Sequence, residues 1–198
     1  RFPYCRGRIF AVVEPDHGQY DTPTQIFWAT GAALMIRRTS YLKAGGLDAQ
    51  FFAHMEEIDL CWRLNSRGEK IVCLPQSIIY HLGGGTLNVD NPRKTYLNFR
   101  NNLLMIYKNE SDEQLNNVLR MRKLLDNLAA IVFLLKGDVA NFKAVRKARK
   151  DFKKMKDDFI DKRKENMKLT TQTTFPFNYN GSIVWSYYAL GKKNYAEL

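Results

Sequence analysis

The sequence contains few acidic residues, few cysteines and no long apolar run. Its 198 residues carry 20 Asp and Glu against 31 Lys and Arg, which gives a formal net charge of +11. Cys5, Cys61 and Cys73 lack metal-ligand spacing and cannot all pair within the chain, so we expect free thiols and a reducing cytoplasm. We find no signal peptide and no stretch long enough to cross a bilayer. With 45% hydrophobic residues, the chain can still bury the core of one domain.

The most informative segment runs from Gly45 to Gly68, where a glycine turn and an aromatic loop precede a short helix. On a helical wheel, Glu56, Asp59 and Arg63 share one polar arc. Asp59 and Arg63 are four residues apart, so their simplest interpretation is a surface ion pair. Glu57 instead falls among the apolar residues, in the first turn of the helix.

This position of Glu57 allows two interpretations. Desolvation raises the pKa of a carboxyl group, whereas the free N–H groups at a helix N-terminus favour its anion. A general base that works near neutral pH needs this balance. Alternatively, with His54 as the N-cap, Glu57 sits at the third helical position and reaches back to the His54 N–H in a capping box. His is a poor N-cap, so that box would be incomplete.

From Gln25 to Arg37 the chain is apolar and rich in β-formers, which predicts a strand in a sheet buried on both faces. Gly31 and Ala32 lie in the middle of this stretch. Small residues inside a strand mark a close approach of another group or plain packing. Trp28 and Thr30 flank the same point, and we expect them to face a ligand bound there.

His81 follows a predicted short strand and precedes three glycines. An imidazole at this place can ligate a divalent ion or contact a diphosphate, and the N–H groups of the glycines can bind phosphate. The alternative is a structural histidine beside a loop.

The C-terminal half of the chain is predicted to be helical. An amphipathic helix is expected over residues 94–108, where Arg100 is either solvated or directed into a cleft. The next helix follows Ser111 and ends with the apolar segment 129–135, which suits a membrane interface or a buried core.

Residues 143–168 form a basic helix with twelve Lys and Arg against five Asp and Glu, a net charge of +7. An anionic membrane surface is its expected partner, and a solvated charged helix is the alternative. Nucleic acid is not expected, because no stacking aromatics are interleaved with the basic residues.

Several segments, in their order and spacing, resemble the C-terminal half of family 2 glycosyltransferases, especially the bacterial rhamnosyltransferase-like branch of surface-polysaccharide enzymes. The segments are TGAALMIRR (Thr30 to Arg38), GGLDAQFF (Gly45 to Phe52), EEIDLCWRL (Glu56 to Leu64), RGEKIVCLPQSIIYHLGGGT (Arg67 to Thr86) and NFRNNLLMIYKN (Asn98 to Asn109). In the commoner form of the family, the third of these begins with Glu-Asp, and that second acidic residue is the base. Glu57 stands at this position with an arm one methylene longer.

The resemblance implies that Glu57 removes the proton of an acceptor hydroxyl. It also implies a divalent metal, Mg²⁺ or Mn²⁺, which stabilises the departing diphosphate with His81 close by. The substrate contacts expected from the pattern and the resemblance are Trp28, Thr30, Gly31, Ala32, Glu56 and Arg100. The nucleotide-binding half, with its Asp-x-Asp metal motif, is expected upstream of a chain that begins Arg-Phe-Pro. We therefore expect a fragment that is inactive alone and binds no nucleotide-sugar tightly.

The expected fold is α/β, in two parts. Residues 1–110 form the acceptor-side half of a GT-A-like nucleotide-diphospho-sugar transferase domain, and residues 111–198 form a helical, basic, membrane-associated extension. The expected function is inverting transfer of a sugar from a nucleotide-sugar donor to a hydroxyl of a lipid-linked or growing saccharide, in cell-surface polysaccharide synthesis. The expected location is cytoplasmic, at the inner face of the cell membrane. The alternative is a non-catalytic basic helical module that binds an anionic membrane surface or polymer, with Glu57 as a capping residue and His81 as a packing residue.

Overall fold

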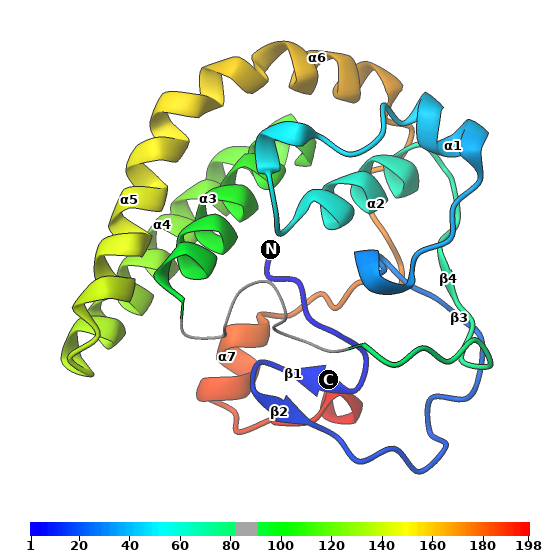
Figure 1. Ribbon diagram of the computed structural model, residues 1–198, viewed down its shortest axis with the longest axis horizontal. Helices are drawn as coiled ribbons and strands as arrows, with labels where there is room; N and C mark the ends of the chain where they lie inside the picture. Colours follow the sequence, from blue (N-terminus) through cyan, green and yellow to red (C-terminus); the bar gives the residue numbers. More distant parts are fainter. Residues whose placement is uncertain (82–90) are drawn as a thin grey trace.

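The computed structural model describes residues 1–81 and 91–198, and helices dominate it (Figure 1). The helices and 3₁₀ turns are η1 (Gly31–Ala33), α1 (Arg38–Lys43), η2 (Ala49–Phe51), α2 (Glu56–Ser66), α3 (Pro92–Asn109), α4 (Asp112–Leu135), α5 (Val139–Met155), η3 (Lys156–Phe159), α6 (Ile160–Leu169), α7 (Ile183–Tyr188) and η4 (Tyr195–Glu197). The strands are β1 (Arg8–Ile9), β2 (Val12–Val13), β3 (Thr24–Gln25) and β4 (Val72–Cys73). β1 pairs with β2 and β3 with β4, both antiparallel.

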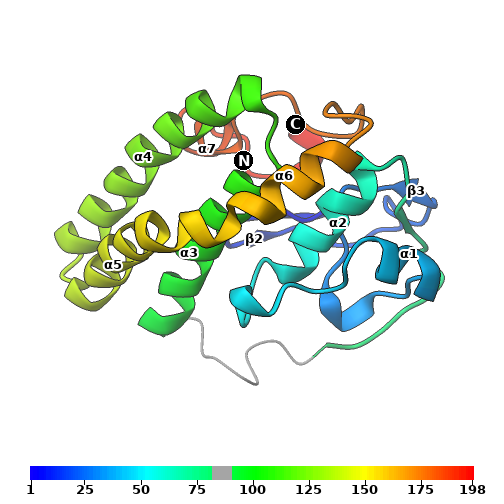
Figure 2. The ribbon, with the colours of Figure 1, turned by 90° about the horizontal axis from the view of Figure 1, so that it is seen from above.

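Helix α3 is the centre of the fold. Its N-cap is Asn91, whose side chain accepts a hydrogen bond from the Arg93 N–H, and Pro92 occupies the first position, where a missing N–H is tolerated. α5 packs along α3, α4 packs on both, and α2 and α6 contact α3 (Figure 2). The helix predicted over residues 94–108 is therefore confirmed, with two residues more at its start and one more at its end.

One hydrophobic core joins the two predicted parts of the chain. Phe51, Trp62 and Leu103 from the first part share it with Phe152 and Phe159 from the second. The rings of Phe51 and Phe159 meet edge to face with centroids 6.0 Å apart. The predicted division at residue 110 falls between α3 and α4, but the helices after it pack onto the rest of the chain.

The expectation of a buried strand over residues 25–37 is wrong. Only Thr24 and Gln25 form a strand, and it pairs with the two residues of β4. The chain then turns into the helical core, because the Phe27 carbonyl accepts a hydrogen bond from the Asn65 side chain at 2.8 Å and the Phe27 ring packs on Trp62. The described residues contain no larger sheet than these two pairs and are predominantly helical.

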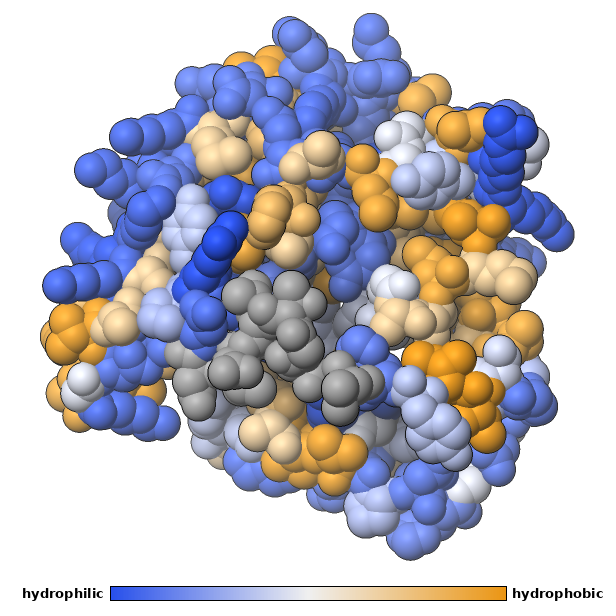
Figure 3. Space-filling view, in the orientation of Figure 1, coloured by the Kyte–Doolittle hydropathy of each residue, from blue (hydrophilic) through white to orange (hydrophobic). Residues whose placement is uncertain are grey.

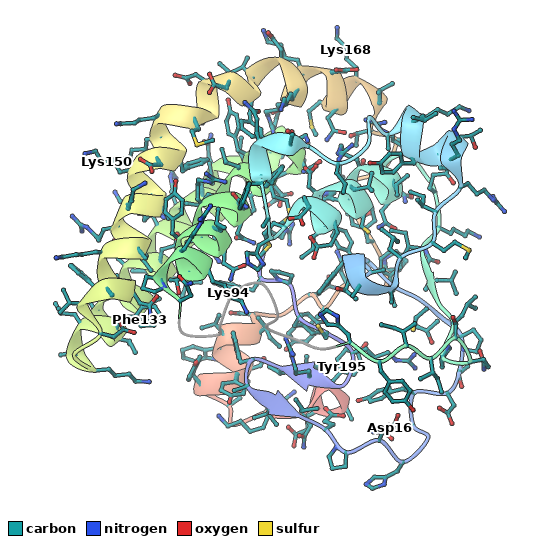
Figure 4. The ribbon with its side chains drawn as sticks, in the orientation of Figure 1. Asp16, Lys94, Phe133, Lys150, Lys168 and Tyr195 are labelled. Carbon is teal, nitrogen blue, oxygen red and sulfur yellow. The ribbon has the colours of Figure 1, made fainter. Side chains whose placement is uncertain are left out.

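The basic region is two helices rather than one. The 3₁₀ turn η3 separates α5 from α6, and the three segments arch over α3 (Figure 1). Phe152 and Phe159 on their inner side are buried in the core. Lys150 and Lys168 point outward (Figure 4). Within the described ranges, no helix combines the length and the hydropathy that a bilayer crossing requires.

Helix α4 turns a charged face toward the fold and an apolar face outward. Asp126 is fully buried, and its carboxylate binds Arg122 at 2.7 Å and Arg149 of α5 at 2.6 Å. An outer stripe of apolar side chains, spaced three or four residues apart and each at least 50% exposed, consists of Met121, Leu124, Leu128, Ile131 and Leu135. A helix of a soluble protein normally shows the reverse arrangement. Of the predicted alternatives for residues 129–135, a buried core helix holds only for Ala130 on the inner face.

Candidate active site

The turn before α2 has an unusual backbone conformation. Phe52, His54 and Met55 have positive φ angles of 67°, 69° and 74°. Non-glycine residues rarely adopt this region, and such strained positions cluster at functional sites. Met55 is the N-cap of α2 and makes no side-chain cap bond within the described part of the chain. His54 is therefore not the N-cap, and the capping-box interpretation of Glu57 is wrong.

Two buried side chains of α3 hold this turn in place. Asn101 Nδ2 donates to the carbonyl oxygens of Phe51, Ala53 and His54 at 2.9, 2.8 and 2.7 Å. Arg100 donates to the Phe51 carbonyl at 3.0 Å and, through Nε, to Asn101 Oδ1 at 2.8 Å. Backbone carbonyls buried outside regular structure need such partners. The conformation of the turn therefore depends on α3.

A buried network fixes α2 against α3. Asp59 is fully buried and accepts hydrogen bonds from Arg63 Nη2 at 2.8 Å, Lys108 Nζ at 2.9 Å and Asn109 Nδ2 at 2.7 Å. Arg63 Nη2 also donates to the Gly46 carbonyl at 2.7 Å, which ties the glycine turn to α2. The interpretation of Asp59 and Arg63 as a surface ion pair is therefore wrong. Their polar arc faces the interior because α3 supplies polar partners there.

Asp48 extends this network to α6. Its carboxylate accepts hydrogen bonds from Lys108 Nζ at 2.9 Å and Lys162 Nζ at 2.7 Å. Burial acts to raise the pKa of Asp48, but the hydrogen bonds from Lys162 and Lys108 outweigh it and lower the pKa to about 2. The loop before α2 is thus tied to both α3 and α6.

Glu57 lines a cavity of about 300 Å³ that the N-terminal segment, the turn before α2 and the first half of α3 enclose. The lining residues are Pro3, Tyr4, Cys5, Arg8, Phe10, Trp28, His54, Met55, Glu57, Ile58, Lys94, Asn98 and Ile183. Glu57 Oε2 is buried and has no hydrogen-bond partner among the described residues. Burial raises the pKa of Glu57, the charge of Glu56 raises it further, and a hydrogen bond from the backbone of Glu57 opposes them.

Trp28 and two cations complete the cavity. Trp28 Nε1 donates to the Tyr4 carbonyl at 3.2 Å, which fixes the plane of the indole. An aromatic face of this kind can pack against the apolar C–H face of a sugar ring. Arg8 comes from β1 and Lys94 from the N-terminal end of α3 (Figure 4). One base, one aromatic plane and two cations can together bind a hydroxylated ligand with an anionic group and remove a proton from it.

The structure brings together some of the predicted site residues and separates others. Glu57 and Trp28 line the same cavity. Thr30, Gly31 and Ala32 are exposed, in and just before η1, and lie outside the lining of that cavity. The irregular path of the chain after β3, which replaces the predicted strand, carries them away from Glu57.

Glu56 and Arg100 also lie outside the lining. Glu56 Oε2 is buried without a partner in the described ranges, and its charge acts on Glu57. Arg100 is buried against the turn before α2 and borders a different groove. Arg100 therefore binds the turn before α2, and Glu56 is the neighbour of Glu57 in α2 itself.

The described residues supply no complete set of metal ligands by themselves. His81, the predicted ligand, is exposed at the end of the first described range, and the three glycines after it lie outside the described residues. Across residues 1–81 and 91–198, no three His, Cys, Asp or Glu side chains come together as ligands. Cys5, Cys61 and Cys73 are free thiols, as predicted.

Sequence reasoning missed several residues that line the cavity, notably Arg8, Lys94, Asn98 and Ile183. Arg8 lies in a loop-rich segment and Ile183 in the aromatic tail, and only tertiary packing brings them to Glu57. Lys94 and Asn98 are four residues apart on a predicted helix, so a shared polar face was the available signal.

Sequence comparison matches part of the chain to two rhamnosyltransferases. Over 54 residues, 27% of the chain, it is 35% identical to the N-acetylglucosaminyl-diphospho-decaprenol L-rhamnosyltransferase of Mycobacterium tuberculosis, of which the match covers 18%. Over 52 residues, 26% of the chain, it is 31% identical to rhamnosyltransferase WbbL of Escherichia coli, of which the match covers 20%. The chain thus spans about a fifth of the length of these curated relatives. No family model and no solved structure matches it.

Proposed function

We propose that the chain is the acceptor-side part of an inverting family 2 glycosyltransferase of the rhamnosyltransferase-like branch, with Glu57 as the general base. The observation that carries the proposal is the half-buried Glu57, which lines a cavity and keeps one buried oxygen, Oε2, without a partner among the described residues. The partial similarity to two rhamnosyltransferases supports the same class of reaction.

In the proposed reaction, the Glu57 carboxylate accepts the proton of an acceptor hydroxyl while the hydroxyl oxygen attacks the anomeric carbon of the donor. The bond from that carbon to the nucleotide diphosphate breaks on the opposite face, and the diphosphate leaves with the electron pair. The raised pKa of Glu57 makes its ionised form a stronger base than an ordinary glutamate. Trp28 supports the sugar ring, and Arg8 and Lys94 attract anionic groups of the substrate.

The proposed donor is a nucleotide-sugar, and the proposed acceptor is a lipid-linked saccharide of cell-surface polysaccharide synthesis. The name of the mycobacterial relative describes an acceptor in which a diphosphate joins N-acetylglucosamine to decaprenol. We carry over only this chemical class, a saccharide joined through diphosphate to an isoprenoid. Dependence on Mg²⁺ or Mn²⁺ is part of the proposal, with ligands from outside the described residues.

Peripheral association with the cytoplasmic face of a membrane is a further part of the proposal. The outer stripe of α4 has the exposed basic residues Arg120, Lys123 and Lys136 on the same helix or at its end, and α5 exposes more. Apolar insertion, together with about 1 kcal/mol for each Lys or Arg near an anionic surface, favours a lipid partner. If a second copy of the protein docked on this face, the basic residues of the two copies would lie close together and repel one another, which disfavours a dimer.

The non-catalytic alternative is less well supported. It requires Glu57 to act as a capping residue, whereas the N-cap of α2 is Met55, which makes no side-chain cap bond in the described structure. It also gives no role to the cavity that Glu57 and Trp28 share.

The test is Glu57→Gln in the complete enzyme, which keeps the size of the side chain and removes its basicity. We expect sugar transfer to fall by about 10²- to 10⁴-fold, the usual contribution of a general base, with little change in folding. Glu113→Gln, an exposed substitution in the first turn of α4, is the matched control and should leave transfer unchanged. Transfer by the Glu57 variant within tenfold of wild type would contradict the assignment.

A further inference from the structure

A second concavity lies on the other side of the N-terminal half of α3. This groove has a volume of about 480 Å³ and runs between α3 and α5. Its lining residues are Phe52, Pro92, Arg93, Tyr96, Leu97, Arg100, Ala140, Lys143, Ala144 and Lys147. Four of these ten side chains are cationic, and none of the described residues that line it is acidic.

Aromatic rings hold three of the cations in place. The Arg93 guanidinium lies over the Phe52 ring, 5.1 Å from its centroid, and Arg100 lies 5.3 Å from the centroid of Tyr96. Lys147 Nζ lies over the same Tyr96 ring, 4.3 Å from its centroid. Rings at these distances attract cations and restrict their motion.

Part of this positive charge is available to a ligand. Arg93 and Lys143 are exposed, and neither makes a salt bridge within the described ranges. Lys147 pairs with Asp151, and Arg100 is occupied by backbone carbonyls. Guanidinium and ammonium groups gathered in one groove repel one another and are the donors that proteins use to bind phosphate. The chemistry of the groove therefore fits an anion with several oxygens.

The groove lies beside the Glu57 cavity. Lys94 and Asn98 of α3 line the cavity, whereas Arg93 and Tyr96 of the same helix line the groove. The two sites are thus separated by about the diameter of one helix with its side chains, roughly 10–12 Å.

Beyond the groove, the surface becomes apolar. Ala140 lines the groove at the start of α5, and the exposed Leu134, Leu135 and Val139 lie at the tip where α4 meets α5. Figure 3 shows apolar side chains gathered at this tip, within a surface that is mostly hydrophilic along α5 and α6. A base, a cationic groove and an apolar tip therefore follow one another across the molecule.

From this order we infer that the α3–α5 groove binds the diphosphate of a lipid-linked acceptor, with the isoprenoid directed to the α4–α5 tip and the saccharide to Glu57. The inference rests on the proposed function, which supplies the class of acceptor. Arg93 and Lys143 donate to the phosphate oxygens, and Lys147 adds positive charge beside them.

The experiment measures binding without catalysis. Isothermal titration calorimetry of the protein with farnesyl diphosphate, inorganic diphosphate, farnesol and thymidine diphosphate separates the chemical groups. We expect farnesyl diphosphate to bind most tightly, inorganic diphosphate more weakly, and the other two at least tenfold more weakly than farnesyl diphosphate. The double variant Arg93→Ala/Lys143→Ala should lose at least tenfold in affinity for both diphosphates. Its matched control, Lys150→Ala/Lys153→Ala, removes two exposed lysines of α5 outside the groove and should stay within twofold of wild type.

Three outcomes would overturn the inference. The first is an equal loss in the groove variant and its control, which would indicate diffuse charge. The second is thymidine diphosphate binding as tightly as farnesyl diphosphate, which would indicate a nucleotide site. The third is a groove variant that releases the protein from phosphatidylglycerol vesicles without weakening either diphosphate, which would indicate a headgroup site. Glu57→Gln should bind farnesyl diphosphate like wild type, so failure of the groove and failure of the base are distinguishable.

Discussion

Asn101 Nδ2 lies 2.7 Å from the carbonyl oxygen of His54, and this hydrogen bond joins the centre of α3 to the turn before α2, which positions Glu57. Asn101 is fully buried and donates to three carbonyls of the turn. It acts on the proposed chemistry only through this turn, so we regard it as a positioning residue.

The Asn101→Asp variant tests this role. A carboxylate of the same shape cannot donate and would repel the carbonyls, so we expect about 1–3 kcal/mol or more of lost stability and a lower kcat. Urea unfolding and transfer kinetics measure the two effects. Asn102→Leu is the matched control, because the Asn102 side-chain amide is buried without partners among the described residues. A buried amide without partners keeps its desolvation penalty, so replacing Asn102 by an apolar side chain should be neutral or stabilising. Equal losses at both positions would refute the specific role of Asn101.

The pH dependence of transfer should report Glu57. Because burial raises the pKa of Glu57, the acid limb of kcat/KM should lie above the ordinary value for glutamate, with activity rising as the carboxylate ionises. The charge of Glu56 contributes to this shift. Glu56→Gln removes a like charge, so the pKa of Glu57 should fall and the acid limb should move to lower pH. If the acid limb of kcat/KM stays at the same pH or moves to higher pH, a group other than Glu57 controls it.

Acid should weaken the network around Asp48. Its pKa is lowered to about 2, so its contribution to the free energy of unfolding is present above the unfolded value of 3.8 and is lost as the pH falls toward 2. The expected loss is on the order of 2 kcal/mol. Urea denaturation at pH 7 and pH 3 should show a smaller difference for Asp48→Asn than for wild type. Asp158→Asn, at an exposed position of η3, should keep the wild-type difference.

Vesicle binding should depend on the outer stripe of α4 and on basic charge. We expect Leu124→Gln/Leu128→Gln to reduce co-sedimentation with phosphatidylglycerol vesicles severalfold, because the pair removes apolar surface that would enter the interface. Leu42→Gln/Leu47→Gln, at exposed positions away from α4, is the matched control.

The electrostatic part of vesicle binding has its own signature. Lys150→Glu/Lys153→Glu should weaken binding most at low salt, because exposed charges are screened beyond about 8 Å at physiological ionic strength. Equal binding of wild type to neutral and anionic vesicles, or binding to neither, would remove the membrane from the proposal.

Helices were predictable from the sequence because their signals are local. The helix at residues 94–108 followed from apolar spacing, and the position of Glu57 among apolar neighbours followed from the helical wheel. The strand over residues 25–37 failed because the propensity of a segment does not reveal which groups will pair with it. Here Asn65 binds the Phe27 carbonyl, and that contact cannot be read from either segment alone.

The site was predictable at its centre and not at its edges. Glu57 and Trp28 were named from local pattern and resemblance, and both line the cavity. Asp59 was assigned to the surface because a wheel shows polarity but not the neighbour, and Lys108 of α3 makes that polar arc internal. The α3–α5 groove has no sequence signal at all, since its two walls are far apart in the chain.

The charged inner face of α4 sets the rotation of the helix about its own axis. Rolling α4 by half a turn would hide the outer stripe, but it would pull Asp126 away from Arg149 of α5 and leave Arg122 as its remaining partner. Removing one member of a buried ion pair is unfavourable by about 3–5 kcal/mol. The ion pair therefore holds α4 in the orientation in which its apolar side faces outward, even in water. The same ion pair leaves the outer stripe of α4 in contact with water wherever no membrane covers it.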